Sequence, residues 1–233
     1  MKIALLGYGK MGKTIETIAV QRGHTIVLKT SETINEGIKE ADVAIDFSVP
    51  DAAVHNISNC FNHNVPVISG TTGWLDHYED MVLLCQEKQG AFIYASNFSL
   101  GVNIFFELNK NLAKMMASLK DYHVTLEEIH HTQKLDAPSG TAISLAQDII
   151  ANHERYDHWA LDQKQDKTIP ITAKRIENVS GTHSIDYISD VDTIEIKHTA
   201  HSRQGFALGA VVAAEWLLGK TGVFTMKDVL NIG

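Results

Sequence analysis

The feature that most constrains the fold is a run of glycines near the start of the chain. A short apolar stretch at residues 2–6 leads directly into Gly7-Tyr8-Gly9-Lys10-Met11-Gly12, and residues 10–22 have the spacing of an amphipathic helix. Glycines in such a strand–loop–helix unit permit a tight turn, close approach of a pyrophosphate and close helix packing, while the helix N-terminus attracts anions. The pattern predicts a dinucleotide site, and the alternative is a purely structural glycine turn.

The rest of the first half repeats this alternation of short apolar runs and amphipathic stretches. We expect strands at 25–28, 42–46, 66–70 and 91–95, and helices at 51–62 and 75–88. Short strands separated by helices predict a parallel sheet with helices on both faces. The first half therefore indicates a Rossmann-like, doubly wound α/β domain.

The second half changes pattern. We expect helices at 100–120, 139–153, 206–218 and 226–230, strands at 122–129, 169–176, 183–188 and 193–201, and an irregular polar surface segment at 154–167. The last three strands leave no room for crossover helices, so their sheet should be antiparallel or mixed, in an α+β domain. We assign residues 1–98 and 204–233 to the dinucleotide-binding domain, and residues 99–203 to a substrate-binding and oligomerisation domain.

Charge and composition exclude several classes of protein. The 20 basic and 28 acidic residues give a net charge of −8, which disfavours a non-specific nucleic-acid binder. We find neither an apolar run long enough to span a membrane nor a signal peptide, so we expect a cytoplasmic protein without a nucleic-acid or membrane partner. The two cysteines, Cys60 and Cys85, lie in apolar helical patterns that predict reduced core thiols.

The end of the second predicted strand bears on the choice of cofactor. An NAD site usually has an acid at this point to accept hydrogen bonds from the ribose, but here Lys29-Thr30-Ser31 follows the strand and Glu32 comes only later. A lysine beside two hydroxyl groups suits the 2′-phosphate of NADPH. The alternative is that Lys29 is an ordinary solvated lysine, so the sequence predicts NADPH, NADH or both as cofactor.

Two further loops follow predicted strands, where ligands bind in open α/β sheets. Gly70-Thr71-Thr72-Gly73 follows the fourth strand, and Ser96-Asn97-Phe98-Ser99 follows the fifth. Both are small and polar, so we expect them near the ribose or nicotinamide. Each is equally compatible with a simple turn.

The segment richest in chemically active side chains is 127–142. It contains Glu127, Glu128, His130, His131 and Lys134, and ends in Pro138-Ser139-Gly140-Thr141 at the start of a predicted helix. Histidine exchanges protons near neutral pH, and a lysine donates a proton or binds an anion. The helix N-terminus at Gly140 and Thr141 suits a carboxylate. Adjacent strand residues face opposite sides of a sheet, so at most one of the two glutamates faces this site.

The chain contains 12 histidines, which raises the question of a metal site. His153 and His158 resemble a zinc-protease pair, but their spacing of five residues directs them to different sides of a helix. We interpret both as surface residues and predict no metal.

Several motifs together resemble one enzyme family along the whole chain. The most specific is Glu128-Ile129-His130-His131 with Lys134 and the segment from Asp136 to Ala142. The accompanying motifs are Gly7 to Gly12, Asp46-Phe47-Ser48, Gly70 to Gly73, Asn97 to Asn103 and Gly222 to Leu230. This combination resembles the 4-hydroxy-tetrahydrodipicolinate reductase family, long called dihydrodipicolinate reductase, of lysine and diaminopimelate synthesis.

The resemblance implies NAD(P)H-dependent reduction of a small cyclic dicarboxylate to tetrahydrodipicolinate by a homotetramer. It implies that His130 is the acid–base residue, that Lys134 is a proton donor, and that His131, Gly140 and Thr141 bind a substrate carboxylate. The resemblance implies cofactor contacts from the segments Gly7 to Gly12, Gly70 to Thr72 and Ala95 to Phe98. The glycine loop is one residue shorter than in many members, and Lys29-Thr30-Ser31 replaces an acid that members often carry.

Two rival functions remain open from the residues alone. One is another Rossmann dehydrogenase acting on a small amino or keto acid, and the other is a non-catalytic nucleotide-binding paralogue. The signature around His130 argues against the first, and the presence of both His130 and Lys134 argues against the second.

The tetramer has support from the pattern as well, because a sheet with helices on one face only should leave an apolar face open.

Overall fold

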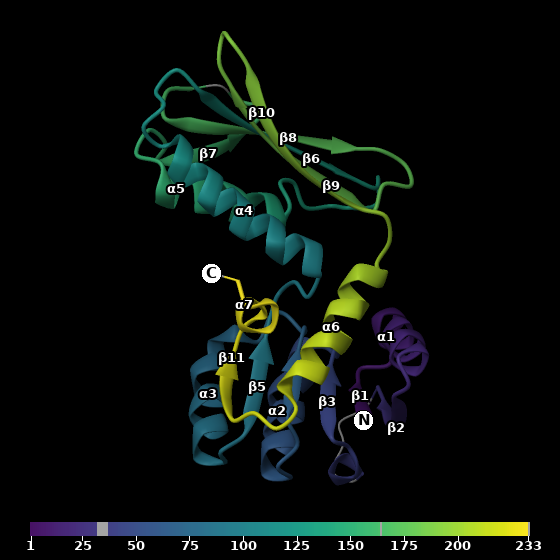
Figure 1. Ribbon diagram of the computed structural model, residues 1–233. Coiled ribbons are helices and arrows are strands. Elements are labelled where there is room, and N and C mark those ends of the chain that lie inside the picture. Colours follow the sequence, from purple (N-terminus) through teal and green to yellow (C-terminus); the bar gives the residue numbers. More distant parts are fainter. Residues whose placement is uncertain (32–36, 164, 233) are drawn as a thin grey trace. The chain divides into compact units, whose positions relative to one another are not determined.

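The chain forms two compact units in a computed structural model that describes residues 1–31, 37–163 and 165–232. One unit comprises residues 1–103 and 204–233, and the other comprises residues 104–203 (Figure 1). The second boundary is where the sequence analysis placed it, and the first lies five residues later than expected.

The first unit is built on a six-stranded sheet in which every pair of neighbours is parallel, in the order β11-β5-β4-β3-β1-β2. Its strands are β1 (Lys2–Leu6), β2 (Thr25–Thr30), β3 (Val43–Asp46), β4 (Val67–Ser69), β5 (Ala91–Tyr94) and β11 (Gly222–Phe224). Its helices are α1 (Lys10–Gln21), α2 (Pro50–Asn62), α3 (Tyr78–Glu87), α6 (Gln204–Leu217) and α7 (Met226–Leu230), with 3-10 turns η1 (Ile38–Glu40) and η2 (Leu75–His77).

Apolar side chains bury both faces of this sheet. Ile15 and Ala19 of α1 pack with α6 on one face, and Phe61 of α2 packs with Cys85 of α3 on the other. Helix α6 approaches the loop after β5 so closely that a Cβ on Gly209 would lie 1.7 Å from the carbonyl oxygen of Phe98. Glycine is therefore required at this contact.

The second unit is a five-stranded mixed sheet in the order β10-β9-β6-β8-β7. β9 is antiparallel to β6 and β10, whereas β8 is parallel to β6 and β7. The strands are β6 (His123–His130), β7 (His158–Leu161), β8 (Thr168–Arg175), β9 (Gly181–Ile188) and β10 (Thr193–Ala200), and the helices are α4 (Leu100–Met116) and α5 (Gly140–Asn152).

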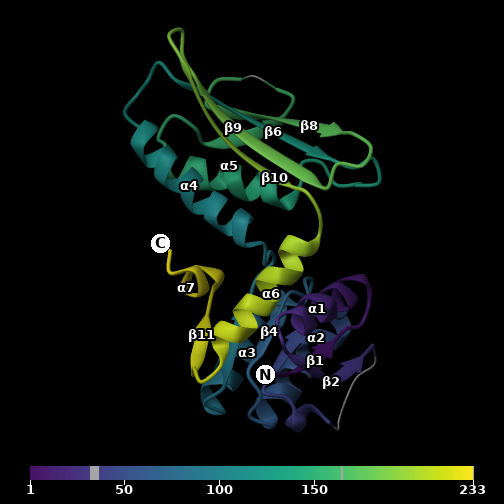
Figure 2. The same cartoon turned by 45° about the vertical axis from the view of Figure 1, so that its right-hand side comes forward.

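The two faces of the second sheet differ in polarity. α4 and α5 lie along one face, where Leu126, Ile185 and Tyr187 are buried against them (Figures 1 and 2). On the open face, Glu127 is opposite Ser184, which is in turn opposite Lys197. The expectation of an apolar open face was therefore wrong: strand alternation places apolar residues under the helices and polar ones opposite.

The fold class predicted from sequence is confirmed, a Rossmann-like sheet together with a second, mixed sheet. Two strands were missed. β7 lies inside the segment expected to be irregular, and β11 is a three-residue strand beside β5. The helix expected to reach residue 120 ends at Met116. The missed strands are short and take their shape from pairing with another strand, β7 with β8 and β11 with β5, which local patterns do not reveal.

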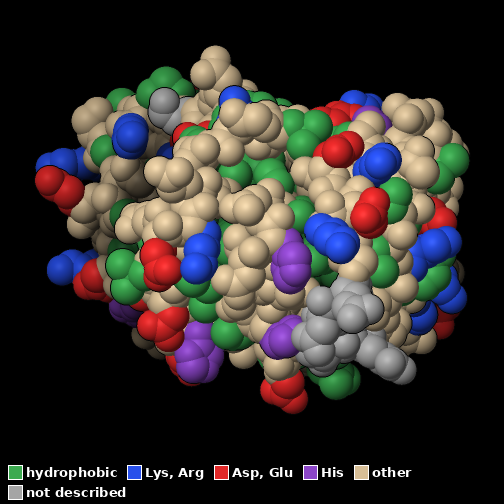
Figure 3. Space-filling view, turned by 90° about the horizontal axis from the view of Figure 1, so that it is seen from below, with side chains coloured by type: hydrophobic (Ala, Val, Ile, Leu, Met, Phe, Trp, Pro, Cys, Tyr) green, Lys and Arg blue, Asp and Glu red, His purple; other side chains and the backbone are tan. Residues whose placement is uncertain are grey.

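Some global expectations can also be compared with the structure. No helix among the described residues combines the length and apolar character that crossing a membrane requires. Cys60 and Cys85 are both free and buried, and burial raises the pKa of the Cys85 thiol to about 11. Figure 3 shows basic and acidic side chains interspersed on the face that it views, with no single-sign patch.

Candidate active site

The candidate nucleotide site lies at the carboxyl ends of the first unit's parallel strands. The chain places β2 on one side of β1 and β3 on the other, so the strand order reverses beside β1. Ligands of open α/β sheets bind outside the strand ends at such a reversal. All the cofactor residues predicted from sequence except Lys29 lie at this same edge, in the loops after β1, β4 and β5 and in the first turn of α1.

The glycine loop after β1 is packed tightly against backbone atoms at Gly7 and Gly12, whereas the space beside Gly9 is free. Gly7 has a φ of 93°, and a Cβ there would lie 2.1 Å from the carbonyl oxygen of Phe47. A Cβ on Gly12 would lie 2.3 Å from the carbonyl oxygen of Gly7, whereas one on Gly9 would meet nothing within 4 Å. Gly9 also begins α1 with no side-chain cap and no acid in the first turn. The backbone N–H groups of Lys10 and Met11 therefore remain for an anion, which fits a pyrophosphate.

A buried carboxylate, Asp46 at the end of β3, ties the next two loops together. It accepts hydrogen bonds from the hydroxyl groups of Ser48 (2.7 Å), Ser69 (2.8 Å) and Thr71 (2.7 Å), and a fourth from Asn56 (3.0 Å). Burial raises the pKa of Asp46, while these four hydrogen bonds oppose the rise. The Thr71 hydroxyl is thus hydrogen-bonded within the protein, and Thr71 can contact a ligand through its backbone.

The remaining loop residues are held in a similar way. Gly70 faces the ring of Phe47, where a Cβ would lie 2.4 Å from the nearest ring atom, and Thr72 is exposed. In the loop after β5, Ala95 and Ser96 are partly or fully exposed, the side chain of Asn97 accepts from the N–H of Ser99 (2.9 Å), and Phe98 is buried. Phe98 therefore reaches a ligand only through its backbone.

Lys29, at the end of β2, is already paired in this structure. Its ammonium lies 2.7 Å from a carboxylate oxygen of Glu16 and 5.2 Å from the centre of the Tyr8 ring. The Tyr8 hydroxyl donates to the same carboxylate. The hydrogen bond to Glu16 raises the pKa of Lys29, so the ammonium persists. Glu16 was missed in the sequence because its partners are 8 and 13 residues away, and Glu32 lies outside the described residues.

In the second unit, β6 carries the catalytic candidates on its buried face. Glu128 and His130 point toward the helices, whereas Glu127 points to the open face and pairs with Lys174. Only one of the two adjacent glutamates therefore belongs to the site, as the alternation of a strand requires.

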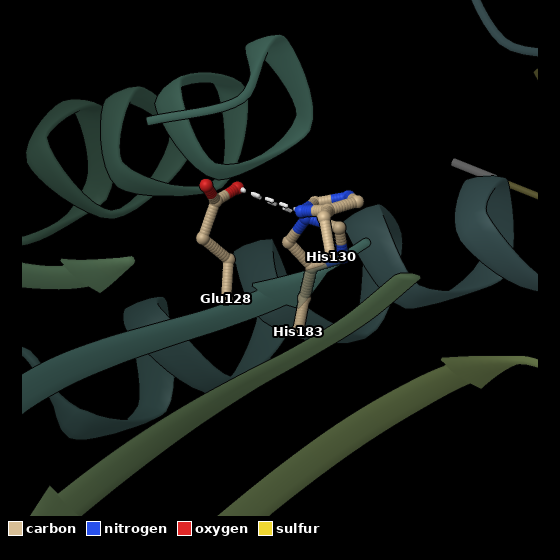
Figure 4. A group of neighbouring side chains, drawn as sticks. All are labelled: Glu128, His130 and His183. Carbon is tan, nitrogen blue, oxygen red and sulfur yellow. Dashed lines mark ion pairs between the residues drawn. The ribbon is translucent and has the colours of Figure 1, made fainter. Parts of the chain in front are cut away.

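Glu128 is completely buried and has four partners, of which Figure 4 shows His130 and His183. Its Oε2 accepts from the backbone N–H of Ser139 (3.0 Å) and lies 3.5 Å from Nδ1 of His130 and 3.7 Å from Nε2 of His183, while Oε1 accepts from Arg175 (3.1 Å). Burial alone would raise the pKa of this carboxyl. Hydrogen bonds from His183, Ser139 and Arg175 outweigh burial and lower the pKa to about 2.

His130 is neutral at physiological pH. Burial, together with the nearby charges of Lys134 and Arg175, lowers its pKa to about 4, although Glu128 acts in the opposite direction. Its Nδ1 is buried beside Glu128. Its Nε2 faces Gly181, where a Cβ would come within 3.2 Å, so the glycine leaves this nitrogen open.

Arg175 connects the loop that carries Lys134 to this cluster. Its guanidinium donates to the carbonyl oxygens of Lys134 (3.2 Å) and Asp136 (2.6 Å), as well as to Glu128. The ammonium of Lys134 lies 2.7 Å from the carboxylate of Asp136, and this hydrogen bond lowers the pKa of Asp136. The Lys134 side chain is thus held by Asp136 at a place where its charge acts on His130.

The N-terminus of α5 completes the cluster. The hydroxyl of Ser139 caps the helix by accepting from the N–H of Ala142 (3.2 Å), and it shares a hydrogen bond with His183 (3.2 Å). The N–H groups of Gly140 and Thr141 are in the first helical turn, which has no intrahelical acceptor for them. A Cβ on Gly140 would meet nothing within 4 Å. This N-terminus suits a carboxylate, and His131, half-buried, follows His130 directly.

The cluster also contains three side chains of types that bind metal ions. Ligand atoms of Glu128, His130 and His183 all lie within 4.8 Å of one another. However, the Glu128 oxygens already accept from Ser139 and from the cation Arg175, so the carboxylate charge is compensated without a metal. The absence of a metal remains a prediction. His153, expected at the surface, is instead 3% exposed and packs against the Tyr156 ring.

The sequence did not predict the roles of three residues in the cluster around Glu128. Glu128 was recognised only as one of two adjacent acids, and His183 and Arg175 were not considered. His183 and Arg175 lie opposite Glu128 and His130 on the neighbouring strands β9 and β8. Only the pairing of β6 with both strands brings them to the site, and no local motif signals this.

Comparison with known proteins agrees with this arrangement. The chain matches the family model described as dihydrodipicolinate reductase, N-terminus, over residues 1–98 and the one described as dihydrodipicolinate reductase, C-terminus, over residues 101–230. It is 62% identical to a 4-hydroxy-tetrahydrodipicolinate reductase of Christiangramia forsetii, over 99% of this chain and 98% of the relative. It is 33% identical to the enzyme of the same name from Neisseria gonorrhoeae, over 93% of this chain and 84% of the relative.

A solved structure supports the fold. The dipicolinate-bound dihydrodipicolinate reductase from Paenisporosarcina sp. TG-14 superposes with a TM-score of 0.78 at 21% identity, covering 98% of both chains. The family models cover nearly the whole chain and its relatives match from end to end, which confirms the resemblance seen in the sequence. This chain belongs to the dihydrodipicolinate reductase family.

Proposed function

We propose that this chain reduces 4-hydroxy-tetrahydrodipicolinate to tetrahydrodipicolinate with a nicotinamide cofactor, as a step of lysine and diaminopimelate synthesis. The observation that carries the proposal is the family membership at 62% identity over 99% of the chain. The structure supports it by gathering neutral His130, cationic Lys134 and the α5 N-terminus into one cluster around Glu128. The rival functions explain neither the identity nor this cluster.

The first unit offers a place for the cofactor, and a reduced nicotinamide bound there supplies the hydride. The open backbone around Gly9 suits the pyrophosphate, and the loops at Gly70 to Thr72 and at Ala95 to Phe98 are fixed segments at the same sheet edge. Lys29 is assigned to the 2′-phosphate of NADPH, for which it would exchange its contact with Glu16.

The second unit offers a place for the substrate. One carboxylate of the dicarboxylate is assigned to the α5 N-terminus, where Gly140 and Thr141 have N–H groups available and Thr141 adds a hydroxyl. His131 is assigned to the same carboxylate. Fixing this end positions the ring relative to His130 and Lys134 before the reaction begins.

The protonation states of His130 and Lys134 match the two proton transfers that the reaction needs. Substrate and product differ by the 4-hydroxyl group, so water must leave and a hydride and a proton must be added. Neutral His130 accepts a proton from the ring carbon beside the hydroxyl-bearing carbon, and Lys134 protonates the departing hydroxyl. After hydride addition, His130 returns its proton to that ring carbon and Lys134 regains one from solvent.

Removal of either proton carrier should abolish most of the catalysis. We expect His130→Ala and Lys134→Ala each to lower kcat by at least about 10²-fold, because general acid–base catalysis contributes this much. Thr141→Val should instead raise the substrate KM, because it removes a hydroxyl from the carboxylate site and leaves both carriers in place. Steady-state kinetics and cofactor binding, measured for all three variants, check this. Near-normal kcat in both alanine variants would contradict the assignment.

The neutral state of His130 can be measured directly. In the free enzyme its ring should titrate with a pKa near 4, well below the usual value near 6.5, because burial disfavours the charged imidazolium. Between these two pH values the unfolded chain binds the proton and the folded chain does not, so His130 lowers stability as the pH falls through this window. Proton NMR of the histidine rings, assigned with His130→Ala, decides the point. A titration near pH 6.5 would refute the neutral-base role.

Cofactor preference should depend on Lys29. Lys29→Ala is expected to raise the KM for NADPH more than that for NADH, because only NADPH carries the 2′-phosphate. Glu16→Gln is the matched variant: it releases Lys29 from its ion pair and should shift the preference toward NADPH. KM values for both cofactors test this. Equal weakening of both cofactors by Lys29→Ala would exclude a phosphate-binding role for Lys29.

We propose a homotetramer that assembles through the second unit's sheet. Its open face is polar, with Glu127 and Lys197 among its side chains, and β10 and β7 are its two edges. Edge strands and an uncovered face are the features that assembly satisfies in sheet proteins. Multi-angle light scattering should give the mass of four chains at micromolar concentration, and a monomer mass would exclude the tetramer.

A further inference from the structure

Glu128 contacts four elements around the catalytic cluster. It contacts His130 on its own strand and His183 on β9, as Figure 4 shows, and also Arg175 on β8 and the backbone of Ser139 at the start of α5. Its side chain has no exposed surface, so it cannot touch substrate itself. A carboxylate that stays charged in such a place must act through its neighbours.

The contact with His130 determines which ring nitrogen is available. Nδ1 is buried with no hydrogen-bond partner and lies 3.5 Å from the Glu128 carboxylate, whose negative charge favours a proton on the nitrogen that faces it. This contact therefore favours the proton of the neutral ring on Nδ1, which leaves Nε2 with its lone pair. On the other side of the ring, Gly181 has no side chain to cover Nε2. The nitrogen that can accept a proton is thus the one that is left open.

The contacts with Arg175 and Ser139 extend this control to the rest of the site. Arg175 is held by Glu128 and in turn holds the carbonyl oxygens of Lys134 and Asp136. Ser139 donates its N–H to Glu128 and begins the helix whose first N–H groups are assigned to the substrate carboxylate. One carboxylate therefore links the base, the loop of the acid and the anion site.

We propose that Glu128 is a positioning residue that holds the Nδ1–H tautomer of His130, presents Nε2 to the substrate, and fixes the Lys134 loop through Arg175. The kinetic consequence rests on the proposed function, whereas the tautomer does not. The role resembles that of the carboxylate that orients a histidine in a catalytic triad.

The tautomer is tested without substrate. Nitrogen-15 NMR of the histidine rings at neutral pH, with the His130 signals identified by their loss in His130→Asn, should show Nδ1 protonated in the wild-type protein. In Glu128→Gln the His130 signals should move toward a mixture of both tautomers. An unchanged His130 tautomer in the variant would overturn the proposal.

Kinetics test the consequence for catalysis. We expect Glu128→Gln to lower kcat roughly ten- to a hundredfold, the range that a hydrogen bond to a charged group represents, with cofactor KM unchanged. Glu127→Gln is the matched control, since Glu127 is the adjacent residue of the same strand on the opposite face, and its kcat should stay within about twofold. Equal kcat in the two variants would refute the positioning role.

A second variant guards against misfolding of Glu128→Gln. Glu128→Asp keeps the buried charge beside Arg175 but withdraws the carboxylate from Nδ1 by roughly one bond length, so it should fold, retain partial activity and show the same change of His130 tautomer to a smaller extent. If the wild-type protein does not reduce the substrate, the proposed function fails while the NMR result still decides the tautomer. If the wild-type protein is active and neither Glu128 variant differs from Glu127→Gln, only the positioning role fails.

Discussion

A carboxylate buried without solvent must gather hydrogen-bond donors around it, and each unit of this protein is organised around one. In the first unit, Asp46 collects hydroxyl groups from the loops after β3 and β4. In the second, Glu128 collects an arginine, a backbone N–H and two histidines. Both acids lie near the ends of strands, so the charge that must be satisfied also fixes the loops where ligands are assigned.

The parts of the fold that sequence predicts are those governed by local rules. The glycine loop is recognisable because Gly7 and Gly12 satisfy steric demands within one strand–loop–helix unit. Long strands and helices follow from their periodicity. By contrast, β7 and β11 are three or four residues long and exist because a neighbouring strand pairs with them. The same limit applies to His183 and Arg175, which reach Glu128 only through the pairing of β6 with β9 and β8.

The polarity of the open sheet face shows a different limit. Alternation along β6 predicts that its residues divide between two faces, but the pattern does not say which face the helices cover. The structure puts Leu126 and Glu128 under the helices and Glu127 outside. Residue type alone does not tell which of two adjacent glutamates is buried, so the sequence did not reveal that the open face is polar. The register of β9 and β10 shows that it is, because it places Ser184 and Lys197 beside Glu127 on that face.

Protonation state is the property furthest from the sequence, because it depends on burial and on every charge nearby. Family resemblance makes His130 an acid–base residue without saying which role it takes first. Burial and the cations Lys134 and Arg175 keep the ring neutral, and only a neutral ring accepts a proton at the start of a reaction. Lys134, whose ammonium lies 2.7 Å from the carboxylate of Asp136, is proposed for the complementary role. In the proposed mechanism, burial of His130 is therefore what assigns the role of base to it and leaves that of acid to Lys134, four residues further along the chain.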